Sequence, residues 1–195
     1  MNRRLAQGFT GDAAPADRPA HTAVIALGAN LGDRVATLAA AVDELGRLPL
    51  TSEVRVAPAI ESVAVKPDGL DEDAPAYLNT VALVSTRLAP SVLLSYLHAI
   101  EDRHGRVRRE RWGDRTLDLD LIAYGDVTSS DPSLLLPHPR AAERTFVLDP
   151  WLELDPEAVI PGAGRVADLR ARLGTTGLGT TGLGTAGEDA AGERT

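Results

Sequence analysis

A chain of 195 residues is long enough for one ordinary domain with a real core and too short for two large ones. Its 44% hydrophobic and 25% charged residues are typical of a soluble globular protein, and no apolar run approaches the ~20 residues that span a bilayer. The net charge of -8 argues against nucleic-acid binding through a broad basic surface, and the lack of cysteine excludes disulfides, thiolate metal sites and cysteine nucleophiles.

Both ends of the chain are predicted to lie outside the folded domain. Residues 1–21 carry arginines but no continuous apolar stretch, which argues against a secretory signal, and we expect a disordered leader there. Residues 174–195 read GTTGLGTTGLGTAGEDAAGERT, which offers too little apolar surface to offset its ordering entropy. A single domain is therefore predicted over residues 22–173, in a protein of the reducing cytoplasm.

The first half of this domain alternates strand and helix signals. Ala23–Leu27 is an apolar run stopped by Gly28 and predicts a buried strand. The apolar residues of Asp33–Leu45 recur at helical spacing and predict a helix. The alternating residues of Glu53–Ile60 and the β-branched residues of Thr80–Thr86 predict further strands.

The second half of the domain is predicted to contain a long loop, a helix and a strand. Glu61–Ala76 is rich in Pro, Asp and Gly and too long for a tight hairpin, and such loops carry function or are mobile. Pro90–Gly105 predicts a second helix, and the alternation of Leu117–Leu121 predicts a strand with leucines in the core. This order predicts an α+β fold with a ferredoxin-like βαββαβ core, in which two main helices back an antiparallel sheet. An additional C-terminal strand and short helices are expected after it.

Two carboxylates leave the last of these strands on one face. Asp118 and Asp120 are two residues apart, so their side chains lie side by side, within reach of a shared cation or a pair of cations. Oxygen ligands of this kind favour magnesium. The alternative is a solvated strand face, although aspartate is disfavoured in strands and these residues follow a dense run of arginines.

The basic residues of this acidic chain gather in one place. Nineteen of the twenty are arginine, and six of these lie between Arg103 and Arg115. A guanidinium fork matches phosphate oxygens, and a polyphosphate needs such donors together with a metal. The candidate donors are Arg106, Arg108, Arg109, Arg111 and Arg115. Alternatively, acidic neighbours pair with these arginines and the cluster is a compensated surface.

Glycine-rich nucleotide motifs do not occur in the sequence. There is no GxxxxGK[ST] loop, and GANLGDR at residues 28–34 lacks the second and third glycines of a dinucleotide fingerprint. Any nucleotide must therefore be held by side chains and metal.

Four segments carry a resemblance to a known family. They read VIALGANLGDR at 24–34, AYLNTV at 76–81, LAPSVLLSYLHAIEDRHGRVRRERWGDRTLDLDLIAYG at 88–125 and LLLPHPRAAERTFVLDPWLELDPEAVIPG at 134–162. They cover most of the predicted domain, and the RWGDRTLDLDLI run is highly specific. The chain resembles the 6-hydroxymethyl-7,8-dihydropterin pyrophosphokinases. This implies transfer of pyrophosphate from ATP to a hydroxymethyl dihydropterin, with release of AMP, in folate biosynthesis.

The resemblance also implies roles for residues at matching positions. Asp118 and Asp120 would hold two Mg²⁺ ions that bridge the ATP phosphates, and Arg106 and Arg115 would complete the catalytic group. Contacts with ATP are expected from His98, Glu101, Arg106, Arg108, Arg109, Trp112, Arg115, His138 and Arg144. Contacts with the pterin are expected from Ser62, Val65, Tyr77, Asn79, Trp112, Asp118 and Phe146, with Tyr77 and Phe146 stacked on the ring. The expected partners are these small molecules, not nucleic acid or a membrane, and a monomer is expected.

Several alternatives stay open at this point. Tyr77 and Phe146 can be ordinary core aromatics, and His98 can be a helix residue without a ligand. The same strand and helix order occurs in single-strand RNA readers, although carboxylates on a central strand and the negative net charge oppose that function. Ile60–Lys66, which reads IESVAVK, departs from the family pattern, so a catalytically silent relative is the other alternative. No general base is assigned.

Overall fold

The computed structural model describes residues 19–62, 64–66, 69–71, 76–105 and 116–174, with backbone alone for the second and third of these ranges. Among these residues, none of the helices combines the length and the apolar character needed to cross a membrane. The predicted leader and tail lie almost entirely outside the described residues. The limits of the domain therefore stay a prediction.

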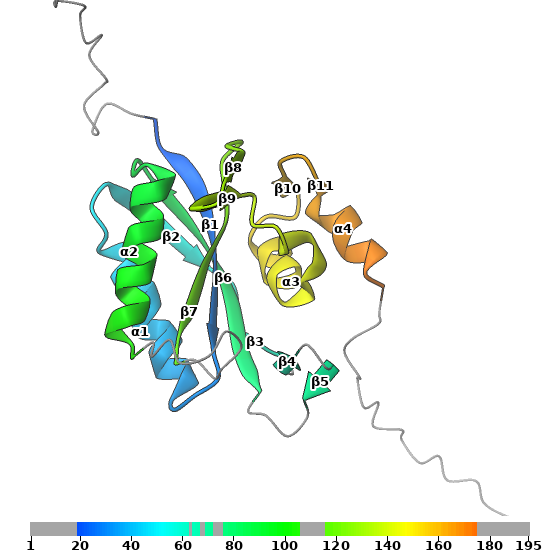
Figure 1. Cartoon of the computed structure of the whole chain (residues 1–195), viewed down its shortest axis with the longest axis horizontal. Helices are drawn as coiled ribbons and strands as arrows, with labels where there is room; N and C mark the ends of the chain where they lie inside the picture. The colour runs from blue at the N-terminus through cyan, green and yellow to red at the C-terminus, as the bar shows by residue number, and fades with distance from the viewer. Residues whose placement is uncertain (1–18, 63, 67–68, 72–75, 106–115, 175–195) are drawn as a thin grey trace, which may run out of the picture.

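A five-stranded antiparallel sheet forms the centre of the described fold (Figure 1). Its middle strands are β1 (His21–Ala29) and β6 (Tyr77–Thr86). β7 (Asp118–Tyr124) pairs with β1 and lies at the edge of the sheet. β2 (Thr51–Val56) and β3 (Ile60–Ser62) pair with successive parts of β6. The strand order is therefore β2-β6-β1-β7, with β3 beside β6.

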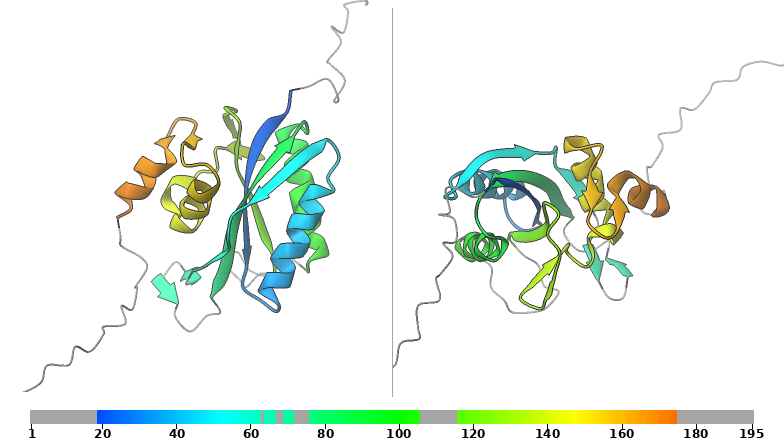
Figure 2. Two further views of the ribbon diagram at one scale, coloured as in Figure 1. Left: turned by 180° about the vertical axis from the view of Figure 1, so that it is seen from behind. Right: turned by 90° about the horizontal axis from the view of Figure 1, so that it is seen from above.

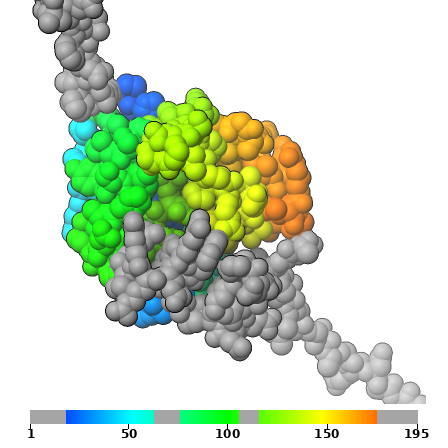
Figure 3. Space-filling view, viewed as in Figure 1, coloured from blue at the N-terminus to red at the C-terminus, as the bar shows by residue number. Residues whose placement is uncertain are grey.

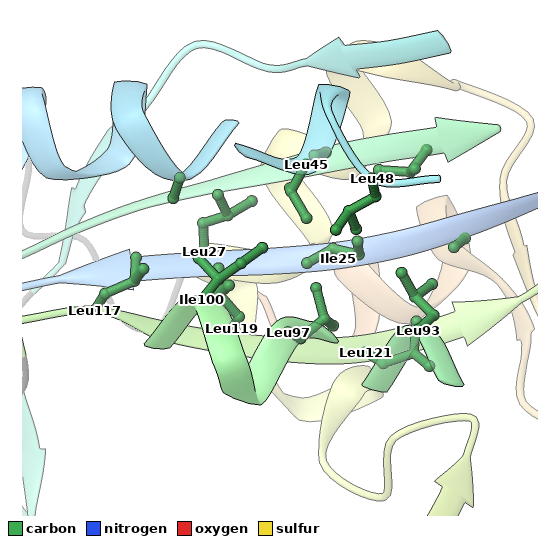
Figure 4. Packing of buried hydrophobic residues seen from close by; sticks show 14 of the residues in the cluster. Ile25, Leu27, Leu45, Leu48, Leu93, Leu97, Ile100, Leu117, Leu119 and Leu121 are labelled. Carbon is green, nitrogen blue, oxygen red and sulfur yellow. The ribbon is translucent and has the colours of Figure 1, made fainter. Parts of the chain in front are cut away.

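Two helices cover one face of this sheet, as both views in Figure 2 show. α1 (Arg34–Gly46) is capped by Asp33, whose Oδ1 accepts a hydrogen bond from the backbone N–H of Ala36 at 3.0 Å. α2 (Pro90–Arg103) begins with proline, which has no N–H to leave unpaired in the first turn. Between sheet and helices lies a hydrophobic core (Figure 4) that includes Ile25, Leu27, Leu45, Leu93, Leu97, Ile100 and Leu119.

The opposite face of the sheet is covered by the C-terminal part of the described chain (Figure 2). α3 (Thr145–Leu154) and α4 (Val166–Arg172) pack there over a second core. This core includes Val24, Val81, Leu83, Ile122, Val147, Leu148 and Trp151. Within the described residues both faces of the sheet are therefore covered, which argues against an RNA reader with an open sheet face.

Short elements complete the described part of the chain. They form three two-stranded sheets and one 3₁₀ turn. These elements are β4 (Ala64–Lys66), β5 (Gly69–Asp71), β8 (Ser129–Asp131), β9 (Leu134–Leu136), η2 (Ala141–Glu143), β10 (Val159–Ile160) and β11 (Gly164–Arg165).

The predicted antiparallel sheet with helices is confirmed, but several strand limits differ from prediction, and the segment predicted as a loop over Glu61–Ala76 contains β4, β5 and most of β3. Gly28 does not stop the first strand, since β1 continues through it to Ala29. The single strand predicted over Glu53–Ile60 is two strands, because β2 ends at Val56 and β3 begins two residues after Pro58. Proline cannot donate to a strand ladder, which explains the break.

Candidate active site

The period-two pattern of β7 is confirmed. Leu117, Leu119 and Leu121 are 0%, 2% and 4% exposed and lie in the core beneath α1 and α2. Asp118 and Asp120 are partly exposed and leave the other face of the sheet, on the side of α3. Both carboxylates therefore share one face, as predicted. In the space-filling view, α2 in green and the yellow segment of η2 and α3 flank β7 (Figure 3).

The strand register brings predicted pterin contacts to the same face. Asn79 on β6 pairs with Gly28 on β1, and Gly28 pairs with Asp118 on β7. Residues directly opposite each other in neighbouring strands point to one face, so Asn79, Gly28 and Asp118 form a row across the sheet. Ser62 pairs with Tyr77 on the same face, and its Oγ accepts a hydrogen bond from Asn79 Nδ2 at 2.8 Å. The predicted pterin side thus lies next to the carboxylate pair.

Gly28 lies in the middle of this row, where Asn79 stands close against its backbone. A Cβ added to Gly28 would lie 3.1 Å from Asn79 Oδ1 and 3.9 Å from Tyr77 Cδ1. A side chain at Gly28 would push against Asn79, whereas Tyr77 is at ordinary contact distance. This role was not predicted from the sequence, although Gly28 lies on the same face of the strand as Val24 and Ala26, at every second residue.

The segment that leads into α3 adds a cation and an aromatic ring. Arg144 Nη1 donates to Asp120 Oδ2 at 2.8 Å, with 19% of the arginine and 31% of the aspartate side chain exposed. The guanidinium carbon of Arg144 also lies 5.6 Å from the centre of the Phe146 ring, within the range of a cation–π contact. Arg144 therefore connects the carboxylate pair to the half-buried Phe146.

His138 lies on the same side and close to Asp120. Its Nδ1 accepts a hydrogen bond from the backbone N–H of Arg140 at 3.2 Å, and its Nε2 lies 3.9 Å from Asp120 Oδ2. Burial lowers the pKa of His138; the carboxylate of Asp120 opposes this and the guanidinium of Arg144 adds to it. The lowered pKa favours the neutral imidazole, and its Nε2 lies beyond hydrogen-bond distance of Asp120.

Glu101 has a different environment from the one expected of an ATP contact. Its side chain is fully buried at the end of α2, and its Oε1 accepts a hydrogen bond from the backbone N–H of Leu119 at 2.9 Å. Leu119 lies between Asp118 and Asp120, so Glu101 supports the carboxylate pair from behind β7. Its contact with ATP stays a prediction. His98, one turn earlier, is exposed.

This arrangement predicts that Glu101→Ala lowers the free energy of unfolding by about 1–3 kcal/mol, because it leaves the buried N–H of Leu119 without its acceptor. Glu101→Gln is the matched control, since an amide oxygen can still accept that hydrogen bond. Urea unfolding, monitored by circular dichroism, measures the free energy of unfolding of both variants. An alanine variant as stable as the unaltered chain would contradict the supporting role.

Other predicted site residues lie outside the described residues. They are Arg106, Arg108, Arg109, Trp112 and Arg115, together with the side chain of Val65. Their roles stay predictions.

The carboxylate pair fits magnesium. Mg²⁺ in phosphate-transfer sites is usually held by one or two carboxylates, with substrate phosphates and waters as the other ligands. Asp118 and Asp120 supply oxygen donors on one face, and the described residues contain no cluster of three or more His, Cys, Asp or Glu that would hold a metal by itself. The donors are thus suited to an ion that arrives with a phosphate ligand.

Comparison with known proteins gives consistent sequence matches. Residues 24–156 match the family described as 7,8-dihydro-6-hydroxymethylpterin-pyrophosphokinase (HPPK). Proteins named 2-amino-4-hydroxy-6-hydroxymethyldihydropteridine pyrophosphokinase are among the relatives. The one from Pseudomonas aeruginosa is 41% identical over 147 residues, covering 75% of this chain and 88% of its own. The one from Methylorubrum extorquens is 39% identical over 156 residues, covering 80% of this chain and 96% of its own.

Solved structures show the same fold. The Plasmodium falciparum protein titled HPPK-DHPS wild type superposes with a TM-score of 0.59 at 12% identity, over 80% of this chain and 41% of that chain. A structure titled HPPK-DHPS in complex with substrates gives a TM-score of 0.58 at 11% identity, over 79% of this chain and 43% of that chain. This chain therefore spans less than half of those longer proteins. From its matched residues and its relatives, the chain belongs to the 7,8-dihydro-6-hydroxymethylpterin-pyrophosphokinase family.

Proposed function

We propose that this protein transfers pyrophosphate from ATP to 6-hydroxymethyl-7,8-dihydropterin, giving AMP and the pterin diphosphate, in folate biosynthesis. The observation that carries the proposal is the row Asn79, Gly28 and Asp118, which sets an amide, a residue without a side chain and a carboxylate on one sheet face. The names of the relatives support it. A flat heterocycle bound against this row would have its substituent beside the carboxylate pair.

The pterin side of the site selects a planar ring with polar edges. Tyr77 and Phe146 are half-buried and would stack on the two faces of the ring. Asn79 offers amide groups that match the donor and acceptor edge of a pterin, and its hydrogen bond to Ser62 fixes the orientation of that amide. These contacts would align the hydroxymethyl oxygen for attack on the β-phosphorus of ATP.

The phosphate side of the site would neutralise the negative charge of the ATP phosphates. Asp118 and Asp120 would hold Mg²⁺, two ions in our proposal, and the metal would neutralise charge on the phosphates when bound. Arg144 and the neutral His138 would donate to oxygens of the nucleotide from the other side of Asp120. Arg106 and Arg115 would stabilise the negative charge that develops on the transferred group.

Further parts of the proposal concern the whole molecule. The element order β1, α1, β2, β6, α2, β7 and the sheet order β2-β6-β1-β7 support a ferredoxin-like topology. We also propose a single domain over residues 22–173, a monomer, and a location in the cytoplasm. Its partners would be the two small-molecule substrates.

The reaction is tested by its nucleotide product. The full-length protein, incubated with ATP, Mg²⁺ and the dihydropterin, is expected to release AMP in proportion to pterin consumed. Chromatography of the nucleotides measures this. ADP in place of AMP would contradict pyrophosphate transfer. ATP binding without pterin binding would favour the catalytically silent relative.

A further inference from the structure

Arg34 connects the start of α1 to two segments beside the pterin side of the site. Its Nη1 donates to the carbonyl oxygen of Ala76 at 2.7 Å, and its Nη2 donates to Glu61 Oε1 at 2.9 Å. The arginine side chain is 31% exposed. A single guanidinium therefore holds β3 through Glu61 and the residue that enters β6.

Both residues that Arg34 holds are chain neighbours of residues on the pterin side. Glu61 precedes Ser62, and Ala76 precedes Tyr77. Ser62 and Tyr77 face each other across the β3–β6 pair, and Ser62 accepts the hydrogen bond from Asn79. A shift of either backbone would thus move a side chain that we assign to the pterin.

The β3–β6 pairing is short enough to need such a tie. β3 has three residues and pairs only with Tyr77–Asn79 of β6 in the described chain, whereas β2 pairs along Ala82–Thr86. So short a strand offers few ladder hydrogen bonds with which to hold its register. A link from α1, which is anchored in the core, supplies a constraint from outside the sheet.

The two contacts of Arg34 differ in strength. Glu61 is 63% exposed, so its ion pair with Arg34 is solvent-screened and contributes little. The hydrogen bond to the Ala76 carbonyl is charge-assisted and partly buried, and it is the stronger link. The planar guanidinium can make both contacts at once, each from a different nitrogen. A lysine ammonium has only one nitrogen and cannot reproduce this geometry.

We infer that Arg34 is a positioning residue for pterin binding: it fixes the backbone at Glu61 and Ala76 so that Ser62, Asn79 and Tyr77 hold the ring. This inference rests on the proposed function. It gives a residue of the GANLGDR segment a role through contacts that leave the nucleotide side untouched. Arg34 therefore controls affinity for the pterin and not for ATP.

The test compares Arg34→Met with Arg34→Lys, and uses Arg47→Met as the matched control. Methionine keeps an unbranched apolar stem but removes both hydrogen bonds. Arg47 follows α1, is 74% exposed and pairs only with Asp43 among the contacts described for its side chain. Fluorescence titration of the full-length protein measures the dissociation constant for the dihydropterin, and calorimetry with Mg²⁺ and a non-hydrolysable ATP analogue measures nucleotide affinity.

Arg34→Met is expected to weaken pterin binding by about tenfold, the loss of one charge-assisted hydrogen bond, and to raise the KM for the pterin more than it lowers kcat. Arg34→Lys should recover part of this loss, and Arg47→Met should bind like the unaltered chain. Nucleotide affinity should not change. Equal losses of pterin and nucleotide affinity, or unchanged pterin affinity in both Arg34 variants, would overturn the inference.

The proposed function fails separately from this inference. If the unaltered chain binds the pterin but releases no AMP, the reaction is wrong while the Arg34 comparison still decides the positioning role. If the unaltered chain binds no pterin, both are overturned. If Arg34→Met does not fold, Arg34→Lys decides, because it keeps the charge and the stem. Weaker pterin binding with unchanged nucleotide affinity then supports the inference, and unchanged pterin affinity overturns it.

Discussion

Replacing Asp118 or Asp120 with asparagine is expected to reduce AMP formation by about a hundredfold to a thousandfold, the effect of losing one group that stabilises transition-state charge. Asparagine keeps the shape of the side chain but loses the charge that would bind Mg²⁺. Neither carboxylate lies in the leucine core, so the fold should survive. Initial rates of AMP release across a magnesium titration measure the loss.

The two substitutions should differ in their effect on the nucleotide. Asp120→Asn also removes the charged partner of Arg144, so ATP affinity should change more than in Asp118→Asn, which lies in the row with Asn79. Asp126→Asn, in the exposed turn after β7, is the control and should retain full activity. Unchanged rates in both site variants would remove these carboxylates from the mechanism.

Adding a side chain at Gly28 is the second change expected to have a large effect. In Gly28→Ala the new Cβ would stand 3.1 Å from Asn79 Oδ1, closer than ordinary van der Waals contact. Asn79 must then move, which disturbs its hydrogen bond to Ser62. We expect the KM for the pterin to rise about tenfold, and more for Gly28→Val, because small shifts of positioning groups are costly.

The glycine at the C-terminal end of α1 supplies the control for Gly28. Gly46 ends α1, and a Cβ built there meets no atom within 4 Å. Gly46→Ala should leave pterin binding unchanged and be neutral or slightly stabilising, since alanine favours the helix. Steady-state kinetics with each substrate varied in turn separate the two variants. A Gly28→Ala variant with an ordinary pterin KM would contradict the role of Gly28 beside Asn79.

The sequence predicted the placement of side chains well wherever one element determined the geometry. The alternation of leucine and aspartate sets which face of β7 each side chain takes, whatever lies next to the strand. The helix signals were equally local: Asp33 caps α1, and Pro90 opens α2. These features need no knowledge of neighbouring strands, and the structure agrees with them.

Features that depend on how strands align were not predicted. The row of Asn79, Gly28 and Asp118 depends on the register of three strands that are distant in the chain, and periodicity carries no register. The burial of Glu101 was missed although the signal was present. It lies four residues after Leu97, on the apolar side of α2, where a carboxylate needs a buried partner.

The position of β7 at the edge of the sheet bears on solubility. An edge strand offers unpaired backbone groups that another copy can extend, which is a common route to aggregation. In this chain the carboxylate of Glu101 accepts a hydrogen bond from the N–H of Leu119, and the carbonyl oxygen of Ile122 accepts one from the N–H of His138 at 2.8 Å. Both backbone groups of β7 are therefore already paired within the chain and are not available to the strand of another copy.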